Sequence, residues 1–415
     1  MVVGSILGLF SYNKLRSAQD EDWVDRLNHV YTTILLIAFA FLVTGGLYVG
    51  MPIECLKPHG TDIEMGYVNS FCWIRNTYYV PMEEGGFPTS EEYKDHQEIS
   101  FYQWVPQILI FMALMFKLPS VVWRMFNGGT GINMDKMVSM TVDSQIGDAE
   151  KREETVSMIA KYLDRWLRAH HHYEDNAIVR FRHKMNTACC FLFSKREGTY
   201  LVGLYFVVKA LYATNTIAQF FILNSLLGSW FSTVGFDSIN GQFGHWNTSH
   251  IFPRVTFCDG HIRQMNQKIN HFTTQCLLPI NLFNEKIFIF LWYWLVLVSA
   301  CTLGNLVFWL WRSLFNRNKV AYVKKYLKMM DEIRENDDKK LVKEFADDYL
   351  RDDGMFVLRI VARNTNDILL SDIIRHMWAI FKHKRQERER KESQDLDHLF
   401  NESKDLNKSK DIILV

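Results

Sequence analysis

Long apolar stretches separated by charged blocks dominate the pattern along this chain of 415 residues. The first runs from His29 to Val49, and no Asp, Glu, Lys or Arg occurs between Arg26 and Glu54. A helix that crosses a bilayer needs about 20 mostly apolar residues, and residues 106–126, 199–227 and 287–311 also meet this requirement. The last of these is uncharged throughout, too long and too apolar for a buried helix of a soluble domain. The pattern therefore predicts four transmembrane helices.

Hydrophilic blocks at residues 50–102, 127–198 and 312–415 dilute the average composition, so that 22% of all residues are charged, as in a soluble protein. The net charge of +1 argues against a nucleic-acid partner. Acidic residues precede the first span, which is too long for the core of a signal peptide. We therefore expect this span to be an uncleaved anchor.

The distribution of Lys and Arg beside the spans predicts their orientation. The segment after the fourth span is rich in basic residues, and the 127–198 block is also basic, so both are expected in the cytoplasm. The 50–102 block has only Lys57, Arg75 and Lys94 against nine acidic residues, and is expected outside. Both termini would then be cytoplasmic.

Apolar residues at helical spacing in Ile159–Leu167 and Met377–Phe381 predict helices within the cytoplasmic blocks. Beyond Glu392 the composition is polar and predicts disorder. The expected fold class is an all-α membrane protein with four transmembrane helices, a mainly helical cytoplasmic domain and two disulfide-stapled extracellular loops. The expected segments are 1–28, 29–49 (first span), 50–105 (outer loop), 106–126 (second span), 127–198 (inner loop), 199–227 (third span), 228–286 (outer loop), 287–311 (fourth span), 312–391 (helical cytoplasmic region) and 392–415 (tail).

Cysteine positions agree with this topology. Four of the seven cysteines, Cys55, Cys72, Cys258 and Cys276, lie in the two outer loops, where disulfides persist. Cys189, Cys190 and Cys301 lie in the inner loop or in a span. Four cysteines allow three pairings. Pairing within each loop and pairing between the loops both remain open on the sequence alone.

Several motifs resemble the innexins, a family of gap-junction channel proteins. The entrance of the second span reads Phe101-Tyr102-Gln103-Trp104-Val105-Pro106, close to the family signature Tyr-Tyr-Gln-Trp-Val-Pro. The segments His250–Asp259, Asn284–Trp292 and Leu350–Arg359 are also similar to innexin sequence. Connexins carry three cysteines in each outer loop, and the Gln-Trp-Val-Pro signature is not expected in pannexins. The resemblance extends from the first span to about residue 363.

The resemblance implies a subunit of a ring of about eight copies, closed around a wide pore. Two such hemichannels would dock through their outer loops at plasma-membrane cell junctions and pass ions and small solutes. It also implies disulfides Cys55–Cys276 and Cys72–Cys258, and a cytoplasmic dome around the pore. The apolar start of the chain, Met1, Val2, Val3, Gly4 and Ser5, would form a funnel in the pore mouth, although a short disordered tail is the alternative. The acidic residues Asp20 to Asp25 suit a helix start and could also favour cations in the vestibule.

Three residues in the spans have a structural interpretation, and for two of them a functional interpretation is also open. Lys209, the one charge in the third span, either packs among helices near Tyr205, Asn215 and backbone carbonyls or touches the permeation path. Pro106 suits the first turn of a helix, with a role in gating as the alternative. Pro119 is expected to bend or end the second span.

The sequon Asn247-Thr248-Ser249 lies in the second outer loop. A glycan there could oppose docking and favour an unpaired hemichannel. Sequons at Asn401 and Asn407 lie in the cytoplasmic tail and should stay unmodified.

Residues that could carry other chemistry are few. His170-His171-His172 has no spaced acidic or thiol partner and is expected on a polar helix face rather than on a metal. Gly128–Gly131 lacks the lysine of a phosphate-binding loop and is expected as a turn. No catalytic triad or cofactor fingerprint occurs, so we expect no enzyme and no cofactor.

The tail offers two contacts. The mixed-charge segment Lys382–Lys391 is either a solvated helix end or a lipid or calmodulin contact. The apolar end Ile412–Val415 could pair with a PDZ sheet edge. The sequence thus favours a homomeric or heteromeric gap-junction channel subunit. An unpaired hemichannel and a non-conducting four-pass adhesion protein are the alternatives.

Overall fold

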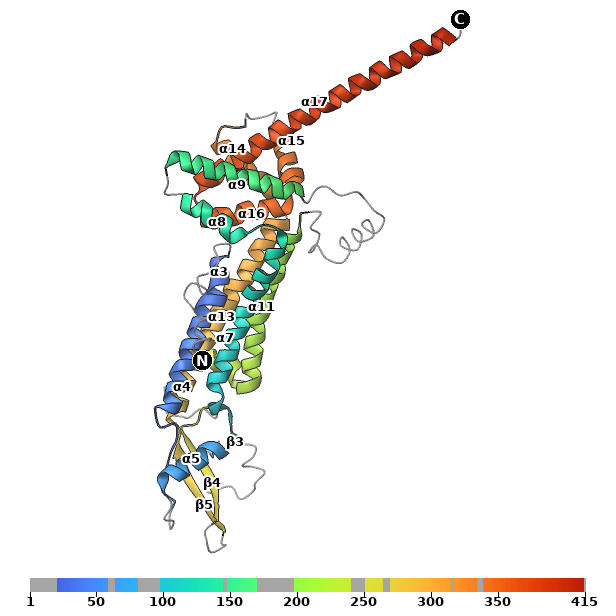
Figure 1. Cartoon of the computed structure of the whole chain (residues 1–415). Coiled ribbons are helices and arrows are strands. Elements are labelled where there is room, and N and C mark those ends of the chain that lie inside the picture. The colour runs from blue at the N-terminus through green and yellow to red at the C-terminus, as the bar shows by residue number, and fades with distance from the viewer. Residues whose placement is uncertain are drawn as a thin grey trace. The chain divides into compact units, whose positions relative to one another are not determined.

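The computed structural model describes residues 21–58, 64–80, 98–144, 148–169, 198–239, 251–263, 269–314, 316–333 and 339–413 (Figure 1). The chain divides into two compact units. We call Trp23–Val122 with Val208–Leu306 the bundle unit, and Met1–Asp22, Trp123–Val207 and Val307–Val415 the tail unit. Three of the boundaries between the units fall within the long helices α7 (Val105–Asn127), α11 (Tyr200–Leu227) and α13 (Pro279–Leu314), and the fourth falls just before α3 (Trp23–Arg26).

Among the described residues, four helical segments are long and apolar enough to cross a membrane: Trp23–Tyr48, Val105–Thr130, Tyr200–Leu227 and Pro279–Arg312. The first consists of α3 (Trp23–Arg26), η1 (Leu27–Thr32) and α4 (Thr33–Tyr48). The others are α7 (Val105–Asn127), α11 (Tyr200–Leu227) and α13 (Pro279–Leu314). The prediction of four spans is therefore confirmed.

Two of the spanning helices begin well before the expected spans. The first helix begins at Trp23 rather than His29, and α13 begins at Pro279 rather than near Ile287. Some polar side chains in these extra turns are buried, among them Asn28, Asn281 and Glu285. Asn281 Nδ2, for example, donates to the Pro253 carbonyl at 2.9 Å. Polar and charged residues therefore did not mark the start of these helices. Pro119 lies inside α7, which continues to Asn127 instead of ending there.

The core of the bundle unit is formed by one face of each spanning helix. It includes Leu36 of α4, Phe116 of α7, Leu223 of α11 and Leu295 of α13, all of which are buried. Other faces of the same helices expose large apolar side chains, among them Phe41, Leu42, Phe221 and Leu297. Helices that are apolar all round are typical of membrane spans, where lipid or a neighbouring subunit covers the outer faces.

A short helix, α12 (Trp230–Ile239), follows α11 after a turn at Gly228, whose φ is +68°. It packs closely on α13, because a Cβ added at Gly235 would lie 2.1 Å from the Trp292 ring.

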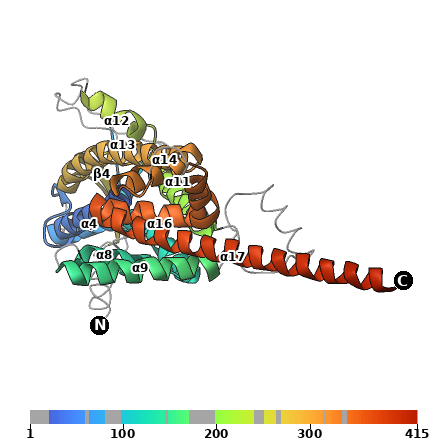
Figure 2. The same cartoon turned by 90° about the horizontal axis from the view of Figure 1, so that it is seen from above.

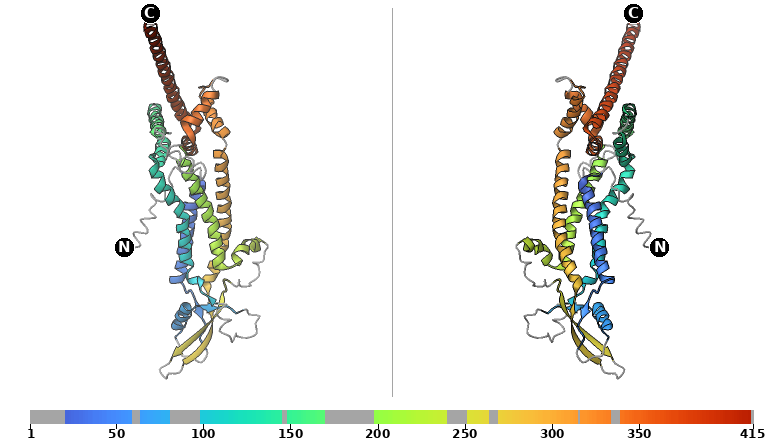
Figure 3. Two further views of the ribbon diagram at one scale, coloured as in Figure 1. Left: turned by 90° about the vertical axis from the view of Figure 1, so that its right-hand side faces the viewer. Right: turned by 90° about the vertical axis from the view of Figure 1, so that its left-hand side faces the viewer.

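The bundle unit also contains a five-stranded antiparallel sheet in the order β1-β5-β4-β2-β3. The short strands are β1 (Glu54–Cys55), β2 (Thr77–Tyr78) and β3 (Glu98–Ile99). The long hairpin is formed by β4 (Val255–Arg263) and β5 (Ile269–Leu277), and α5 (Met65–Arg75) contacts β4 (Figure 3). The all-α expectation holds for the spans but missed this sheet, which combines strands from both outer loops.

The described part of the tail unit is helical, as expected for the cytoplasmic blocks. Besides the ends of the spanning helices, it contains η3 (Gly128–Thr130), α8 (Met134–Asp143), α9 (Ala149–Ala169), α14 (Asn316–Met329), α15 (Lys339–Glu344), η6 (Phe345–Leu350), α16 (Arg351–Asn364) and α17 (Asp367–Ile413). α9 packs against α17 (Figure 2). Phe345, Trp378 and Phe381 form an aromatic cluster between η6 and α17.

The expected disorder beyond Glu392 differs from the structure, in which α17 continues to Ile413. The physical reason is present in the sequence. Leu396, Leu399 and Leu406 recur at helical spacing, which is the pattern of one apolar helix face. A polar composition alone therefore did not identify disorder here.

Candidate functional site

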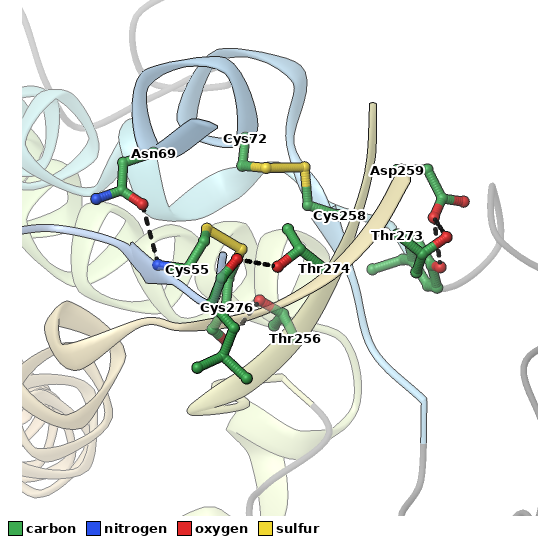
Figure 4. Close-up of a disulfide and its surroundings, with 11 residues drawn as sticks. Cys55, Asn69, Cys72, Thr256, Cys258, Asp259, Thr273, Thr274 and Cys276 are labelled. Carbon is green, nitrogen blue, oxygen red and sulfur yellow. Dashed lines mark hydrogen bonds between the residues drawn. A yellow bond between two sulfur atoms is a disulfide. The ribbon is translucent and has the colours of Figure 1, made fainter. Parts of the chain in front are cut away.

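Two disulfides join the segments that carry the outer-loop cysteines. Cys55 of β1 pairs with Cys276 of β5, and Cys72 of α5 pairs with Cys258 of β4 (Figure 4). This is the pairing between loops that the family resemblance implies. Cys55 and Cys276 are also partners in the β1–β5 register, and the Cys55 amide donates to Asn69 Oδ1 at 3.0 Å. We call α5, the five strands and their two disulfides the cap.

The inner face of the cap is a small apolar core. Val68, Cys72, Tyr102 and Leu278 are buried in it, and Phe272 of β5 closes it. Gly260 lies directly under the Phe272 ring, since a Cβ there would be 2.0 Å from that ring. Glycine is thus required at this position of β4 for close approach of the ring, rather than for its backbone freedom.

The opposite face of the cap carries polar bonds between three strands. Asp259 of β4 accepts hydrogen bonds from Tyr78 Oη of β2 at 3.1 Å and from Thr273 Oγ1 of β5 at 2.7 Å. Burial and the Asp259 carboxylate raise the pKa of Tyr78 well above its ordinary value. The phenol therefore remains a hydrogen-bond donor at all physiological pH values.

The signature at residues 101–106 connects the cap to α7. The Gln103 amide donates to the Trp73 carbonyl at the end of α5 and to Asn76 Oδ1 at 3.3 Å. Asn76, which follows the last residue of α5, has φ +73° and ψ 169°, a backbone conformation outside the left-handed helical region that residues other than glycine rarely adopt. Gln103 therefore satisfies a carbonyl of the last turn of α5, which would otherwise lack a partner within that helix.

The aromatic residues of the signature fix its position by packing. Tyr102 is fully buried, with its ring 4.9 Å from the Trp73 ring, and burial raises its pKa. Phe101 meets Phe252 edge to face at 5.2 Å, so Phe in the first signature position is well packed. Pro106 lies in the first turn of α7, where a missing N–H costs least. Trp104 is 61% exposed and available to lipid or to another subunit.

Lys209 is paired with a residue that sequence reasoning missed. Its Nζ lies 2.7 and 2.8 Å from the two carboxylate oxygens of Asp25, and both side chains are buried. The two residues are 184 positions apart, so no spacing rule could pair them. The ion pair supports packing among helices, the first of the two readings.

Next to this pair, His29 Nδ1 lies 2.7 Å from the Asp25 carbonyl and 3.3 Å from Tyr212 Oη. Asn28 Nδ2 donates to Thr302 Oγ1 at 2.9 Å, which links the first helix to α13. Polar residues near the start of the first span are therefore engaged inside the bundle.

Asp22 is a second buried carboxylate, within the tail unit. It accepts from Tyr205 Oη at 2.8 Å and from Trp309 Nε1 at 2.6 Å, and it forms an ion pair with Arg363 of α16. The Arg363 guanidinium also lies 5.0 Å from the Trp309 ring centroid. The idea that the acidic cluster faces a vestibule to favour cations is therefore wrong for Asp22 and Asp25, because both are buried and paired.

The segment Leu350–Arg359, similar to innexin sequence, joins several helix ends of the tail unit. Arg351 donates to the Leu167 carbonyl near the end of α9 at 2.7 Å, and Asp352 forms an ion pair with Lys319 of α14. A Cβ added at Gly354 would lie 3.2 Å from Cδ2 of Leu167, so α16 packs closely on α9 at this point.

Asp353 caps the start of α11. Its carboxylate accepts from the Val202 amide at 3.0 Å, and its own amide donates to the Gly198 carbonyl at 2.8 Å. Burial raises the pKa of Asp353 to about 6, and the amide hydrogen bond only partly opposes this. This carboxylate therefore changes charge near neutral pH.

Some predicted site residues lie outside the described residues. These are Met1 to Ser5, Asn247, His170 to His172, Cys189 and Cys190. The turn predicted at Gly128–Gly131 is present, as η3 followed by Gly131 at φ +78°. Among the described residues, the group of three potential metal ligands that lie close together is Cys55, Cys72 and Cys276, whose sulfurs are in disulfides.

These features define a helical membrane protein with four spans, in which the segment between the first and second spans and the segment between the third and fourth form one disulfide-pinned sheet. The innexin family model matches residues 21–381. Innexin unc-9 of Caenorhabditis elegans is 34% identical over 364 residues, covering 86% of this chain and 92% of that protein. Innexin-19 of the same organism is 31% identical over 416 residues, covering 93% and 89%.

The chain belongs to the innexin family. Innexins are gap-junction channel subunits, and this chain is accordingly a membrane protein of gap junctions. The family is a family of channels rather than of enzymes.

Proposed function

We propose that this chain assembles into a ring of about eight subunits around a wide pore, and that two rings dock through their caps to connect neighbouring cells. Ions and small solutes would pass from cytoplasm to cytoplasm. The ring would be homomeric or would include other innexins.

The cap is the observation that carries this proposal. Docking requires a surface whose shape is set before contact, because ordering a loose loop on contact costs free energy. Two cross-links between segments 221 and 186 residues apart supply that order, and one sheet combines both loops. A cap built in this way is well suited to protein–protein docking.

Orientation is the second part of the proposal. A chain that crosses four times has both ends on the same side, and we place that side in the cytoplasm. Basic residues after the fourth span support this placement: Arg312, Arg317, Lys319, Lys324, Lys325 and Lys328. Disulfide bonding of the cap supports an oxidising, extracellular location for it.

We also propose that Met1, Val2, Val3, Gly4 and Ser5 line the pore mouth as a funnel. The family resemblance and the uncharged, small-residue-rich composition of this segment support that role. Replacing Val2 and Val3 by Asp should change ion selectivity of the conducting channel without reducing its amount at the cell surface.

Dual whole-cell recording on paired cells that express only this chain tests the docked channel. A junctional current is expected. Asn247→Gln serves as a matched variant: current from both proteins shows that any glycan is tolerated, whereas current from the variant alone indicates a hemichannel that a glycan keeps unpaired. Single-cell membrane current without coupling would support an unpaired pore. Surface expression with no current in either configuration would support the adhesion protein or a subunit that needs a second innexin.

A PDZ partner at the C-terminus is a separate proposal, supported by the apolar end Ile412–Val415. Deleting these four residues should abolish pull-down of PDZ proteins while leaving channel assembly unchanged. Retention of the same proteins by the shortened chain would contradict it.

A further inference from the structure

Two histidines face each other across the β4–β5 hairpin of the cap. His261 and His271 are direct partners in the antiparallel register, and their ring centroids are 4.3 Å apart with planes at 76°. Both side chains are exposed. Directly opposed residues in such a pair have Cβ atoms about 4.5–5.5 Å apart, so one nitrogen of each imidazole can reach a shared ion.

The backbone that carries these rings is held in place on both strands. His261 follows Cys258 by three residues on β4, and His271 precedes Cys276 by five residues on β5, and both cysteines are in disulfides. Because the strands are ordered without a ligand, binding would not have to supply the ordering free energy.

The rings lie on the cap face opposite the disulfides and the Phe272 ring, since side chains alternate along a strand. The next residue pair on the same face is Asp259 and Thr273. Asp259 is held by hydrogen bonds from Thr273 and Tyr78, as Figure 4 shows for Thr273. Its carboxylate adds negative charge beside the two imidazoles, which favours a cation there.

We propose that His261 and His271 bind a Zn²⁺ ion, with water molecules completing its coordination. Imidazole nitrogens coordinate zinc at about 2.0–2.1 Å, and two imidazoles on a tetrahedral ion would have centroids about 5 Å apart. A small rotation of the two side chains opens the present pair to that spacing. The ion bridges β4 and β5 and restrains the hairpin. Mg²⁺ and Ca²⁺ prefer oxygen ligands and do not bind two imidazoles in this way.

Hydrogen–deuterium exchange of the full chain in lipid nanodiscs, followed by mass spectrometry, tests the site. Adding Zn²⁺ should slow amide exchange in peptides from Val255–Arg263 and Ile269–Leu277, and adding Mg²⁺ should not. His261→Gln and His271→Gln should each abolish the zinc effect, because either leaves one imidazole. Both positions are exposed, so exchange without metal should match the wild-type protein.

His376→Gln is the matched control, since His376 is on α17 and its Nε2 lies 2.8 Å from Glu153. This variant should retain the full zinc effect on the hairpin. Wild-type hairpin peptides that do not respond to zinc would overturn the proposal, even if other segments respond. A zinc effect on the hairpin that persists in the double variant His261→Gln/His271→Gln would overturn it as well.

Discussion

Lys209 and Asp25 show what a single buried charge requires inside a membrane protein. Each ion has lost its water, and the partner 2.7 Å away is what makes burial tolerable. The Lys209–Asp25 ion pair therefore adds little net stability, but loss of one of its partners is expected to destabilise the protein strongly.

Removing either partner alone should destabilise the protein by about 3 kcal/mol or more, because the remaining buried charge loses the opposite charge 2.7 Å away that compensates it. Lys209→Met and Asp25→Asn should each lower the thermal midpoint of the detergent-solubilised protein, measured by intrinsic tryptophan fluorescence. The double variant Lys209→Met/Asp25→Asn should recover most of the loss. Two single variants that melt with the wild-type protein would show that the pair is not essential to the fold.

Asp353 gives a pH prediction at the same scale. Its pKa in the folded protein, about 6, is above the ordinary value of 3.8, so the folded state binds this proton more tightly than the unfolded state. The stabilising contribution of the proton is fully present below about pH 4 and is lost as pH rises through about 6. The upper limit of that contribution is about 3 kcal/mol.

Asp353→Asn should remove this dependence, since Asn keeps an oxygen to accept from the Val202 amide but does not titrate. Between pH 7.5 and 4.5, the thermal midpoint of the wild-type protein should rise relative to that of the variant. The neighbouring variant Asp352→Asn, which loses an ion pair with Lys319 instead, should retain the wild-type trend. Parallel pH profiles for wild type and Asp353→Asn would contradict the assignment.

At the scale of elements, the long β4–β5 hairpin depends on one small residue. Gly260→Ala would place a Cβ 2.0 Å from the Phe272 ring, and overpacking of this kind costs about 1–3 kcal/mol. We expect less correctly disulfide-bonded protein, measured by mass spectrometry of non-reduced peptides. Gly66→Ala, on α5 with nothing within 4 Å of an added Cβ, is the control and should be neutral. Equal yields from the two variants would mean that Phe272 moves aside without cost.

At the same scale, some elements could be predicted from the sequence and others could not. The spans were evident because uncharged runs such as 287–311 exceed the length of an ordinary buried helix. The short strands β1, β2 and β3 were missed because two residues offer no pattern to predict a strand, and β1 and β2 pair with strands of the other loop. The long β4–β5 hairpin was missed although the β-branched Val255, Thr273 and Thr274 are typical of strands. The residues that bond to Lys209 and Gln103 are brought close by tertiary folding, and no local sequence pattern predicts them.

For the whole molecule, the disulfides and the helix bundle stabilise different parts of the bundle unit. The buried cluster of the cap contains all four bonded cysteines, whereas the cluster formed by α4, α7, α11 and α13 contains none. An intact Cys55–Cys276 bond already joins the two segments, so the Cys72–Cys258 bond closes a loop of only about 36 residues, which runs through the first disulfide. For a loop of this length the chain-entropy model gives a stabilisation of the folded protein of roughly 3–4 kcal/mol. Loss of that bond should therefore loosen the cap and leave the spanning helices assembled.

The double variant Cys72→Ser/Cys258→Ser, which leaves no unpaired thiol from this bond, should reach the cell surface and form rings of the wild-type size in detergent. Its junctional conductance between paired cells should fall far more than its single-cell membrane current, because only docking requires an ordered cap surface. Phe272→Leu at the inner face of the cap is a milder control and should retain coupling. If the double variant fails to assemble, the cap also contributes to contacts between subunits of one ring, and docking is not its sole role.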